Sequence, residues 1–290
     1  MLDDVIGWLR CPACGAALAR AGGTLRCPNG HAFDIARQGY VSLLASGLTP
    51  VGDTAAMVQA RIDFLAAGHY GPLADAVAVA AGETGSAAQD PAGCVADVGA
   101  GTGYYLAAVL DRVPDRAGLA LDASKFAARR AARAHDRIGA IVADVRGRLP
   151  VADRAAALAL SVFAPRPAAE LRRVLHPAGR LLVVTPDSDH LGELAGPLGL
   201  LAVDPRKDER LTARLRPYFD LAGQHQHRFR LALGHRDVAA AVAMGPSAWH
   251  VDPAELSERI ADLPSPMPVT VSVTMWTFRP ADQRDTRGPR

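Results

Sequence analysis

The stretch Asp97-Val98-Gly99-Ala100-Gly101-Thr102-Gly103 decides the fold that this sequence predicts. It follows an apolar run at 94–98 that predicts a strand, and Tyr104 begins a helical pattern that extends to Val113. Glycines at such a turn let the backbone approach a ligand closely, and the helix N-terminus favours an anionic group. A glycine-rich turn is a weak signal by itself, so its neighbours along the chain decide what it binds.

The rest of the chain alternates strands and helices around this turn. Apolar runs predict further strands at 118–122, 140–144, 157–162, 180–185, 224–233 and 269–278. Helices are expected at 104–113, 124–135, 168–175, 206–217, 235–244 and 253–262. This rhythm predicts an α/β fold with a doubly wound parallel sheet that carries helices on both faces.

Acids stand at the ends of the first three predicted strands. Asp97 precedes the first glycine by two residues, Asp122 ends the second strand and Asp144 ends the third. A carboxylate in the position of Asp122 can accept hydrogen bonds from both hydroxyls of a ribose. Tyr104 stands where a dinucleotide fingerprint would have its third glycine, so a nicotinamide-dependent dehydrogenase is the rival interpretation of the turn.

The N-terminal cysteines predict a metal site. Cys11 and Cys14 form one tight knuckle, and after twelve further residues Cys27 and His31 close a second one. Three thiolates and one imidazole fill a tetrahedral zinc site and leave no open position for water, so the metal would be structural. The alternative is that these cysteines are unrelated buried residues. We interpret the isolated Cys94, which begins an apolar strand, as a core residue of that kind.

Length and composition bound the organisation of the chain. Its 290 residues, 49% of them hydrophobic, suffice for one large domain and a small one. We expect a zinc-binding module at 1–45, to which the family resemblance given below assigns RNA recognition, a linker at 46–60, the large domain at 61–280 and a disordered tail at 281–290. A helix capped by Asp53 or Thr54 should begin within that linker. Without a run of 18 apolar residues or a signal peptide, the expected location is the cytoplasm, away from membranes.

The set of glycine turn and acids resembles the seven-strand S-adenosylmethionine (SAM)-dependent methyltransferases, which have a Rossmann-like sheet. Nearly the whole chain further resembles the bacterial 23S rRNA (guanine-N1)-methyltransferases. The segments that carry this resemblance are CPAC…CPNGH, FDIARQGYVSLL, GDTAAMVQAR…AGHYGPL, VADVGAGTGYY, LDASK and VTPDSDHLGEL. The segments VFAPR and MGPSAWH are similar to the macrolide-resistance branch of that family, where the other branch has Y-A-P-C in place of 163–166.

The resemblance implies two ligands, SAM and a structural zinc ion. The glycine turn would pack on the methionine part of SAM, Asp122 would hold the ribose, and Asp144 would contact the adenine amino group. Asp97 would organise the turn and the amino end of the ligand. The zinc ligands so implied are Cys11, Cys14, Cys27 and His31. The cofactor-binding residues so implied are Tyr70, Asp97, Gly99, Gly101, Gly103, Tyr105, Leu106, Asp122, Asp144 and His190.

The resemblance also implies a reaction and its partners. A methyl group would pass to N1 of a guanine in a 23S rRNA domain II hairpin, guanosine 748 in the resistance branch, and a homodimer would hold the RNA. We expect Phe163 to stack on the target base and Arg166 to reach its O6 atom or a phosphate. A buried core aromatic is the alternative role for Phe163. Arg20, Arg26 and Arg37 of the zinc module are expected to contact RNA. Arg172 and Arg173 are expected on a solvated helix face, with contact to RNA phosphates as the alternative.

Two other functions remain open at this stage. A small-molecule methyltransferase would explain the glycine turn but would leave the zinc module without a role. A zinc-containing RNA-binding or regulatory protein would need a vestigial SAM pocket, against which the intact Asp97, Asp122 and glycines argue. The net charge of +2 predicts no partner by itself, and an aromatic content of 5% argues against a broad stacking platform for single-stranded RNA.

Overall fold

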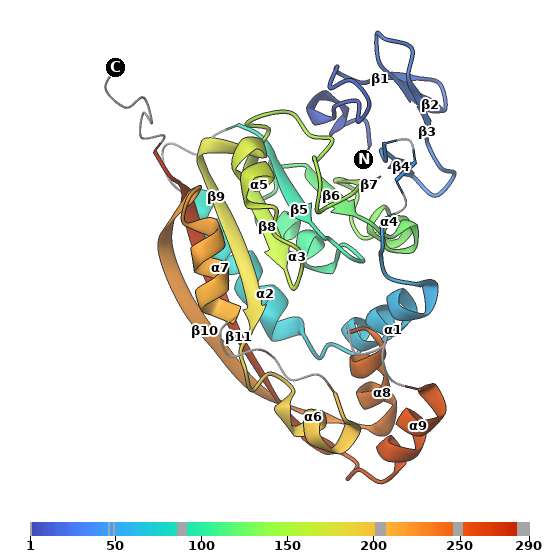
Figure 1. Ribbon diagram of the computed structural model, residues 1–290, viewed down its shortest axis with the longest axis vertical. Coiled ribbons are helices and arrows are strands. Elements are labelled where there is room, and N and C mark those ends of the chain that lie inside the picture. The colour runs from blue at the N-terminus through green and yellow to red at the C-terminus, as the bar shows by residue number, and fades with distance from the viewer. Residues whose placement is uncertain are drawn as a thin grey trace.

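An eight-stranded sheet runs through the centre of the protein (Figure 1). The computed structural model describes residues 2–45, 47–48, 50–85, 92–200, 207–245 and 252–282. The strands follow the order β10-β11-β9-β8-β5-β6-β7-β4 across the sheet. Their bounds are β4 (Tyr40–Ser42), β5 (Cys94–Val98), β6 (Gly118–Asp122), β7 (Ile138–Val142), β8 (Ala156–Val162), β9 (Leu175–Pro186), β10 (Phe219–Leu233) and β11 (Met267–Pro280).

The sheet is mostly parallel. Strands β4, β7, β6, β5, β8 and β9 run in one direction, and β11 and β10 are antiparallel to their neighbours. Every residue of β5, β7 and β8 is buried. Continuous burial is expected of parallel strands that are covered on both faces, and it explains why these segments are uninterrupted apolar runs.

Two hydrophobic cores cover the two faces of the sheet. The alternation is clear in β9, where Leu182 and Val184 enter one core and Leu181 and Val183 enter the other. The first core includes residues of α1, α2, α3, α4 and α8, and the second includes residues of α5, α7 and the N-terminal segment. The helices are α1 (Ala55–Ala66), α2 (Gly71–Gly85), α3 (Tyr104–Arg112), α4 (Lys125–Ala131), α5 (Ala168–Val174), α6 (Gly192–Leu198), α7 (Lys207–Leu215), α8 (His235–Ala243) and α9 (Pro253–Ala261).

The N-terminal segment forms a ribbon that packs on the sheet. Its own three-stranded sheet consists of β1 (Ala19–Ala21), β2 (Thr24–Arg26) and β3 (Ala32–Asp34), preceded by the short helix η1 (Ile6–Trp8). The N–H of Arg10 donates to the carbonyl of Pro150 at 2.9 Å, and the N–H of Ala152 donates to that of Trp8 at 2.7 Å. The ribbon therefore takes the place that a covering helix would have on this part of the sheet.

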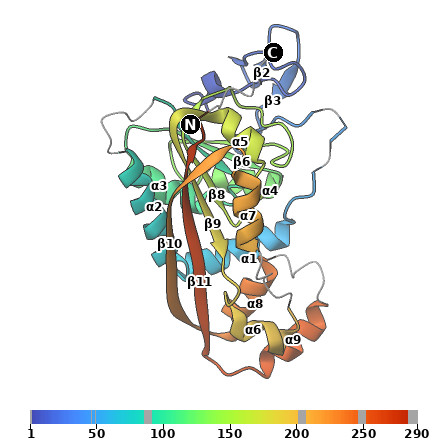
Figure 2. The same cartoon turned by 60° about the vertical axis from the view of Figure 1, so that its left-hand side comes forward.

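Helices α6, α8 and α9 form a lobe at the end of the long β10–β11 hairpin (Figure 2). Helix α8 packs against α1 and α9, while α6 packs against β11 and α9. The lobe faces the carboxyl ends of β5 and β8, which is where ligands bind in open α/β sheets. It thereby supplies the second wall of the cleft described below.

The predicted sheet is confirmed, since β5 to β11 are the seven strands expected of this fold. Strands β5 and β6 have the predicted bounds, whereas β7 ends at Val142, so Asp144 lies two residues beyond its strand. The eighth strand, β4, comes from the segment before residue 45, so the expected module boundary does not separate the ribbon from the sheet. The tail was expected to be disordered, and its residues 283–290 lie outside the described part of the chain.

The expected linker at 46–60 is helical in its second half. Helix α1 begins at Ala55, and the Thr54 hydroxyl accepts a hydrogen bond from the N–H of Met57 at 3.3 Å, as predicted for an N-cap. Within the described ranges, we find no helix that is both long and apolar enough to cross a membrane.

Candidate active site and metal centre

A cleft of about 720 Å³ opens between the carboxyl ends of the strands and the C-terminal lobe. It contains the glycine turn on one side and lobe residues such as Leu194 and Val242 on the other. Most of the predicted cofactor-binding and catalytic residues meet here although they come from four separate segments. Those that line the cleft are Tyr70, Asp97, Gly99, Gly101, Tyr105, Phe163, Arg166 and His190.

Asp122 ties the second strand to the glycine turn. One oxygen of its carboxylate accepts the N–H of Gly101 and the other accepts the N–H of Ser124, both at 2.8 Å. Burial raises the pKa of the Asp122 carboxyl, against these two backbone hydrogen bonds, which lower it. Each oxygen retains a lone pair for a further donor, so the carboxylate is fixed in place and can still accept hydroxyl groups.

Gly99 is required by packing and by backbone conformation. Its φ of +84° is in the left-handed region, and a Cβ atom added there would lie 2.4 Å from the Cβ atom of Ala164. The turn therefore lies directly against the segment that follows β8. This contact brings the cofactor turn and the expected base-binding residue Phe163 to the same place.

Two buried polar groups in the cleft have no hydrogen-bond partner among the described residues. They are an oxygen of Asp97, which is 1% exposed, and the hydroxyl of Tyr105. Burial, with a smaller contribution from the nearby Asp122 carboxylate, raises the pKa of Asp97 to about 8. An unpaired buried carboxyl is costly unless a ligand donates to it. The amino group and positive charge of SAM fit this position.

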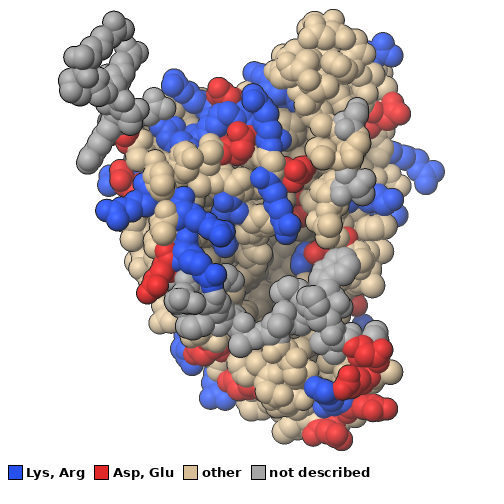
Figure 3. Space-filling view, in the orientation of Figure 1, with Lys and Arg blue, Asp and Glu red and all other residues tan. Residues whose placement is uncertain are grey.

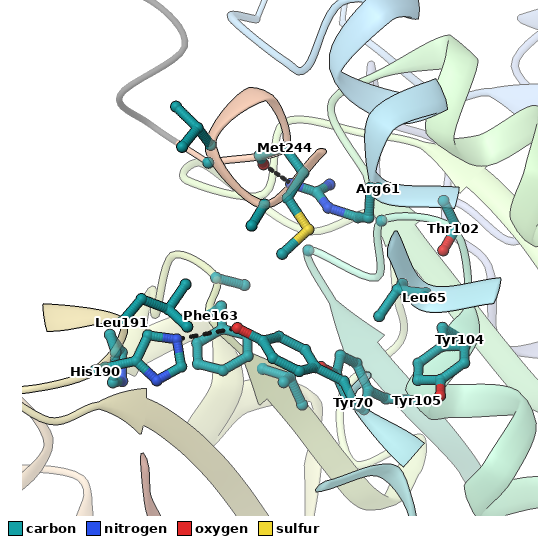
Figure 4. Close-up of a pocket in the computed structure, with 18 of the residues that line it drawn as sticks. Arg61, Leu65, Tyr70, Thr102, Tyr104, Tyr105, Phe163, His190, Leu191 and Met244 are labelled. Carbon is teal, nitrogen blue, oxygen red and sulfur yellow. Dashed lines mark hydrogen bonds between the residues drawn. The ribbon is translucent and has the colours of Figure 1, made fainter. Parts of the chain in front are cut away.

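Aromatic rings form one wall of the cleft (Figure 4). Phe163 is 39% exposed, and its ring centroid lies 5.7 Å from that of His190 and 6.1 Å from that of Tyr70. The Tyr70 hydroxyl and Nε2 of His190 share a hydrogen bond of 3.0 Å. Phe163 has a φ of +53°, which is rare for a residue other than glycine and is typical of functional sites. The predicted alternative of a core aromatic does not describe this exposed ring.

A second hollow of about 390 Å³ adjoins the cleft and is called the nucleoside hollow here. Asp122 and Asp144, for which the family resemblance implies contacts to the ribose and the adenine, both line it. Phe163 lines both hollows, so the two form one continuous site. One Asp144 oxygen accepts the N–H of Arg146 at 3.0 Å, which orients the carboxylate after the strand has ended.

Arg61 is a site residue that sequence reasoning missed. It forms an ion pair with Asp53 and donates from Nη2 to the carbonyl of Met244 at 2.8 Å. The Asp53 carbonyl accepts the hydroxyl of Ser124 at 2.6 Å. Arg61 therefore connects the segment before α1, the cofactor site and the C-terminal lobe. The only signal for it was its place in the segment GDTAAMVQAR, on which part of the family resemblance depends.

Gly103 and Leu106 correct the predicted cofactor set. A Cβ atom on Gly103 would lie 3.1 Å from Cα of Ala131, so this glycine serves the close packing of α3 on α4. Leu106 is fully buried in the first core, and its methyl groups fill the space beside Gly118. Neither is among the described residues that line the cleft or the nucleoside hollow.

The four predicted metal ligands meet in the ribbon. The ligand atoms of Cys11, Cys14, Cys27 and His31 all lie within 4.8 Å of one another. With zinc–sulfur bonds of about 2.3 Å and zinc–nitrogen bonds of about 2.0 Å, a tetrahedron has S–S edges of about 3.8 Å and S–N edges of about 3.5 Å.

The measured distances agree with that geometry. Sγ of Cys14 lies 3.7 Å from Sγ of Cys27, and Nδ1 of His31 lies 3.6 Å from Sγ of Cys11 and 3.3 Å from Sγ of Cys27. The backbone N–H of Ala16 is the main cause that lowers the pKa of Cys14, to about 6. Three thiolates and one imidazole fill all four positions of a tetrahedral zinc ion and leave none for water, which is typical of a structural zinc site.

The arginines expected to contact RNA have different surroundings. Arg26 and Arg37 are exposed on the ribbon, and Arg20 pairs with Asp3 at 2.5 Å. The expectation for Arg173 was wrong, because it is half-buried and pairs with Glu170 at 2.6 Å while donating to the backbone of the segment before β8. Arg173 therefore supports the structure and does not lie on a solvated helix face.

Known proteins share both parts of this chain. Residues 9–46 match the zinc-ribbon family model described as "RlmA, N-terminal". Over 97% of its length, the chain is 52% identical to the 23S rRNA (guanine(748)-N(1))-methyltransferase of Streptomyces fradiae, covering 99% of that protein. It is 53% identical, over 97% of this chain and all of the relative, to a Micromonospora griseorubida protein with the provisional name 23S rRNA (guanine-N(1)-)-methyltransferase.

The chain belongs to the 23S rRNA (guanine-N1)-methyltransferase family. A Bacillus subtilis (strain 168) protein with the same provisional name is 33% identical over 83% of the chain and 86% of its own length. This member of the family is thus an enzyme that uses SAM as methyl donor and carries a zinc ribbon. The ribbon supplies four donors that suit a zinc ion, and the cleft contains an Asp97 oxygen that has no hydrogen-bond partner among the described residues.

Proposed function

We propose that this protein methylates N1 of guanosine 748 in a domain II hairpin of 23S rRNA and thereby contributes to macrolide resistance. The observation that supports it most directly is the position of Phe163. Its exposed ring lies in the same continuous site as Asp97, Asp122 and Asp144. A methyl acceptor stacked on Phe163 would lie beside the donor. The name of the Streptomyces fradiae relative supports the choice of nucleotide.

The protein's contribution to the reaction is mainly positioning. When bound, SAM would supply the methyl group from its positively charged sulfonium, whose sulfur keeps the electron pair of the broken bond and leaves as the neutral thioether of S-adenosylhomocysteine. Asp122 and Asp144 would hold the nucleoside, and Asp97 would hold the amino end. Phe163 would orient a flipped guanine through stacking, and Arg166 would hold its O6 atom or a neighbouring phosphate.

Guanine N1 carries a proton in the neutral base, so this proton must leave as the N1–methyl bond forms. Tyr70 and His190 lie beside Phe163 and are joined by a hydrogen bond. The imidazole is held from its other side, where Nδ1 lies 3.0 Å from the carbonyl oxygen of Ser272. This pair supplies hydrogen-bonding groups next to the proposed base position.

We further propose that the protein acts in the cytoplasm as a homodimer whose zinc ribbons help to hold the hairpin. Residues 1–45 would be the RNA-recognition part and 61–280 the catalytic part. Light scattering after gel filtration tests the dimer, and a monomer at micromolar concentration would contradict it.

Methyl transfer from labelled SAM to an unmodified domain II fragment tests the reaction. An N1-methyl group blocks the pairing edge of guanine, so reverse transcription should stop at a single guanosine, position 748. A stop at another guanosine would contradict the proposed nucleotide. Binding of SAM without transfer to the fragment or to intact 50S subunits would favour a small-molecule acceptor.

A further inference from the structure

A third hollow, of about 410 Å³, lies beside the cleft and is lined by four arginines. Arg146 follows β7, Arg166 follows β8, and Arg210 and Arg214 are on α7. We call this hollow the arginine groove. Among the described residues that line it there is no Asp or Glu. Figure 3 shows basic side chains gathered beside the central hollow of this face, over α7 and α5.

The groove is built on a fixed floor. Leu211 and Leu215, which are 4% and 0% exposed, belong to the second core and anchor α7 against the sheet. Arg210 and Arg214 lie one helical turn apart on the exposed side of this helix. Arg166 donates from Nη1 to the carbonyl of Ala164 at 3.0 Å, which holds its guanidinium near the segment after β8. These arginines therefore project from parts of the chain that are held in place by core packing and hydrogen bonds.

The segment from Phe163 to Pro167 borders all three hollows. Phe163 lines the cleft and the nucleoside hollow, Pro165 lines the nucleoside hollow and the groove, and Arg166 lines the groove and the cleft. Arg210 also lines both the groove and the cleft. A ligand that extends out of the cleft past Phe163 therefore enters a space lined by guanidinium groups.

We propose that the arginine groove binds the phosphodiester of the RNA strand next to the nucleotide being methylated. Guanidinium groups bind phosphate oxygens bidentately, and phosphate contacts fix the register of a nucleic acid without reading its sequence. A base stacked on Phe163 has its own backbone within a few ångströms, and the groove is the basic surface adjoining that position. The inference rests on the proposed function, since it requires an RNA substrate.

Arg214→Gln tests the groove, because Arg214 lines the groove and is not among the residues that line the cleft or the nucleoside hollow. Arg146→Gln is a second variant for RNA binding, although Arg146 also lines the nucleoside hollow. Their matched controls are Arg148→Gln and Arg216→Gln, which remove exposed arginines two residues away in each case. Methylation of the domain II fragment by full-length protein gives KM and kcat, and calorimetry gives the Kd for SAM.

Each groove variant should raise the KM for RNA about 10-fold and lower the slope of log affinity against log salt by about 1, and Arg214→Gln should leave the Kd for SAM unchanged. The controls should stay within about twofold of wild type. A fragment with one uncharged methylphosphonate linkage beside the target guanosine should lose affinity for wild type but not for Arg214→Gln.

Groove variants that match their controls in RNA KM would overturn the assignment while leaving the proposed function intact. A weaker Kd for SAM with unchanged RNA KM would overturn it in favour of a cofactor carboxylate site. Wild-type protein that methylates no RNA would overturn both proposals. The wild-type measurement therefore distinguishes a failure of the proposed function from a failure of the groove assignment.

Discussion

Val5 packs directly over Gly139: Cγ2 of Val5 lies 2.2 Å from the point at which a Cβ atom on Gly139 would stand. Val5 precedes η1 in the N-terminal segment, and Gly139 is the second residue of β7. Both cysteines Cys11 and Cys27 belong to the same hydrophobic core as Val5. The zinc ribbon and the sheet are therefore packed as one unit.

Gly139→Ala should lower the free energy of unfolding by about 1–3 kcal/mol, because the new methyl group overlaps Val5. Adding Val5→Ala should recover part of that loss, since the double variant removes the overlapping atom. Urea denaturation followed by circular dichroism measures all three. Gly7→Ala is the control, because nothing lies within 4 Å of a Cβ atom at Gly7. Single losses that simply add in the double variant would contradict the packing argument.

Zinc removal should destabilise the whole chain. Chelation, or Cys27→Ser, should lower the melting temperature by about 10 °C or more in a single transition, because the ribbon core is continuous with the sheet. Zinc content and thermal unfolding should change together. Cys94→Ala is the control, since this buried thiol lies outside the ligand cluster and zinc content should stay at one per chain. A sheet transition that does not move on chelation would show two independent units.

Asp97 predicts a pH dependence of both stability and cofactor affinity. Its folded pKa of about 8 lies above the ordinary value of 3.8, so the folded protein without cofactor binds more protons than the unfolded chain between these values. Its stability should therefore fall as pH rises from about 4 towards 8. A cationic ligand favours the ionised carboxylate, so SAM affinity should rise with pH through about 8, with release of a proton.

Calorimetry of SAM binding in two buffers of different ionisation enthalpy measures that proton. Asp97→Asn should abolish its release and weaken SAM binding by about 10- to 100-fold, which corresponds to the loss of a charge-assisted hydrogen bond of about 1.5–3 kcal/mol. Asp115→Asn, an exposed acid near α3, should leave both unchanged. Proton release that persists in Asp97→Asn would assign it to another group.

Gly99→Ala should disrupt the cofactor turn more than its backbone strain alone can explain. The added Cβ atom would lie 2.4 Å from Ala164, in addition to the φ of +84°, so we expect a loss of about 2–4 kcal/mol in stability and no measurable SAM binding. Gly22→Ala isolates the conformational part, because Gly22 has a φ of +62° and nothing lies within 4 Å of its Cβ position. Equal losses in the two variants would show that the contact with Ala164 is unimportant.

The sequence predicted the sheet well because its strands carry a strong local signal. β5 and β6 are apolar runs bounded by glycine and acid, and their bounds were predicted without error. Strand β4 has three residues and pairs with β7, about a hundred residues away in the chain. Neither its length nor its pattern identifies that partner, so its place in the large sheet was not predictable from the sequence.

The site was predicted only in part, because several of its contacts join segments that are distant in the sequence. A motif gives the position of Leu106 beside Tyr105 but not the direction of its side chain, which the packing of α3 decides. The arginine groove joins three segments that have no common motif, and the hydrogen bond from Arg61 to the carbonyl of Met244 depends on how α1 meets the lobe. Contacts between distant segments are set by the tertiary fold, and one sequence contains little information about them.

The position of β4 has a consequence for how this chain is made. Residues 40–42 leave the ribosome early, but their partner β7 follows only after about a hundred more residues have been synthesised. The ribbon can bind zinc as soon as its four ligands have been synthesised, but Val5 and the edge of β4 stay exposed until β7 is available. Folding that depends on such distant pairing is slow and open to aggregation. Zinc acquired during translation would thus protect the nascent chain by ordering the ribbon before its binding surface on the sheet exists.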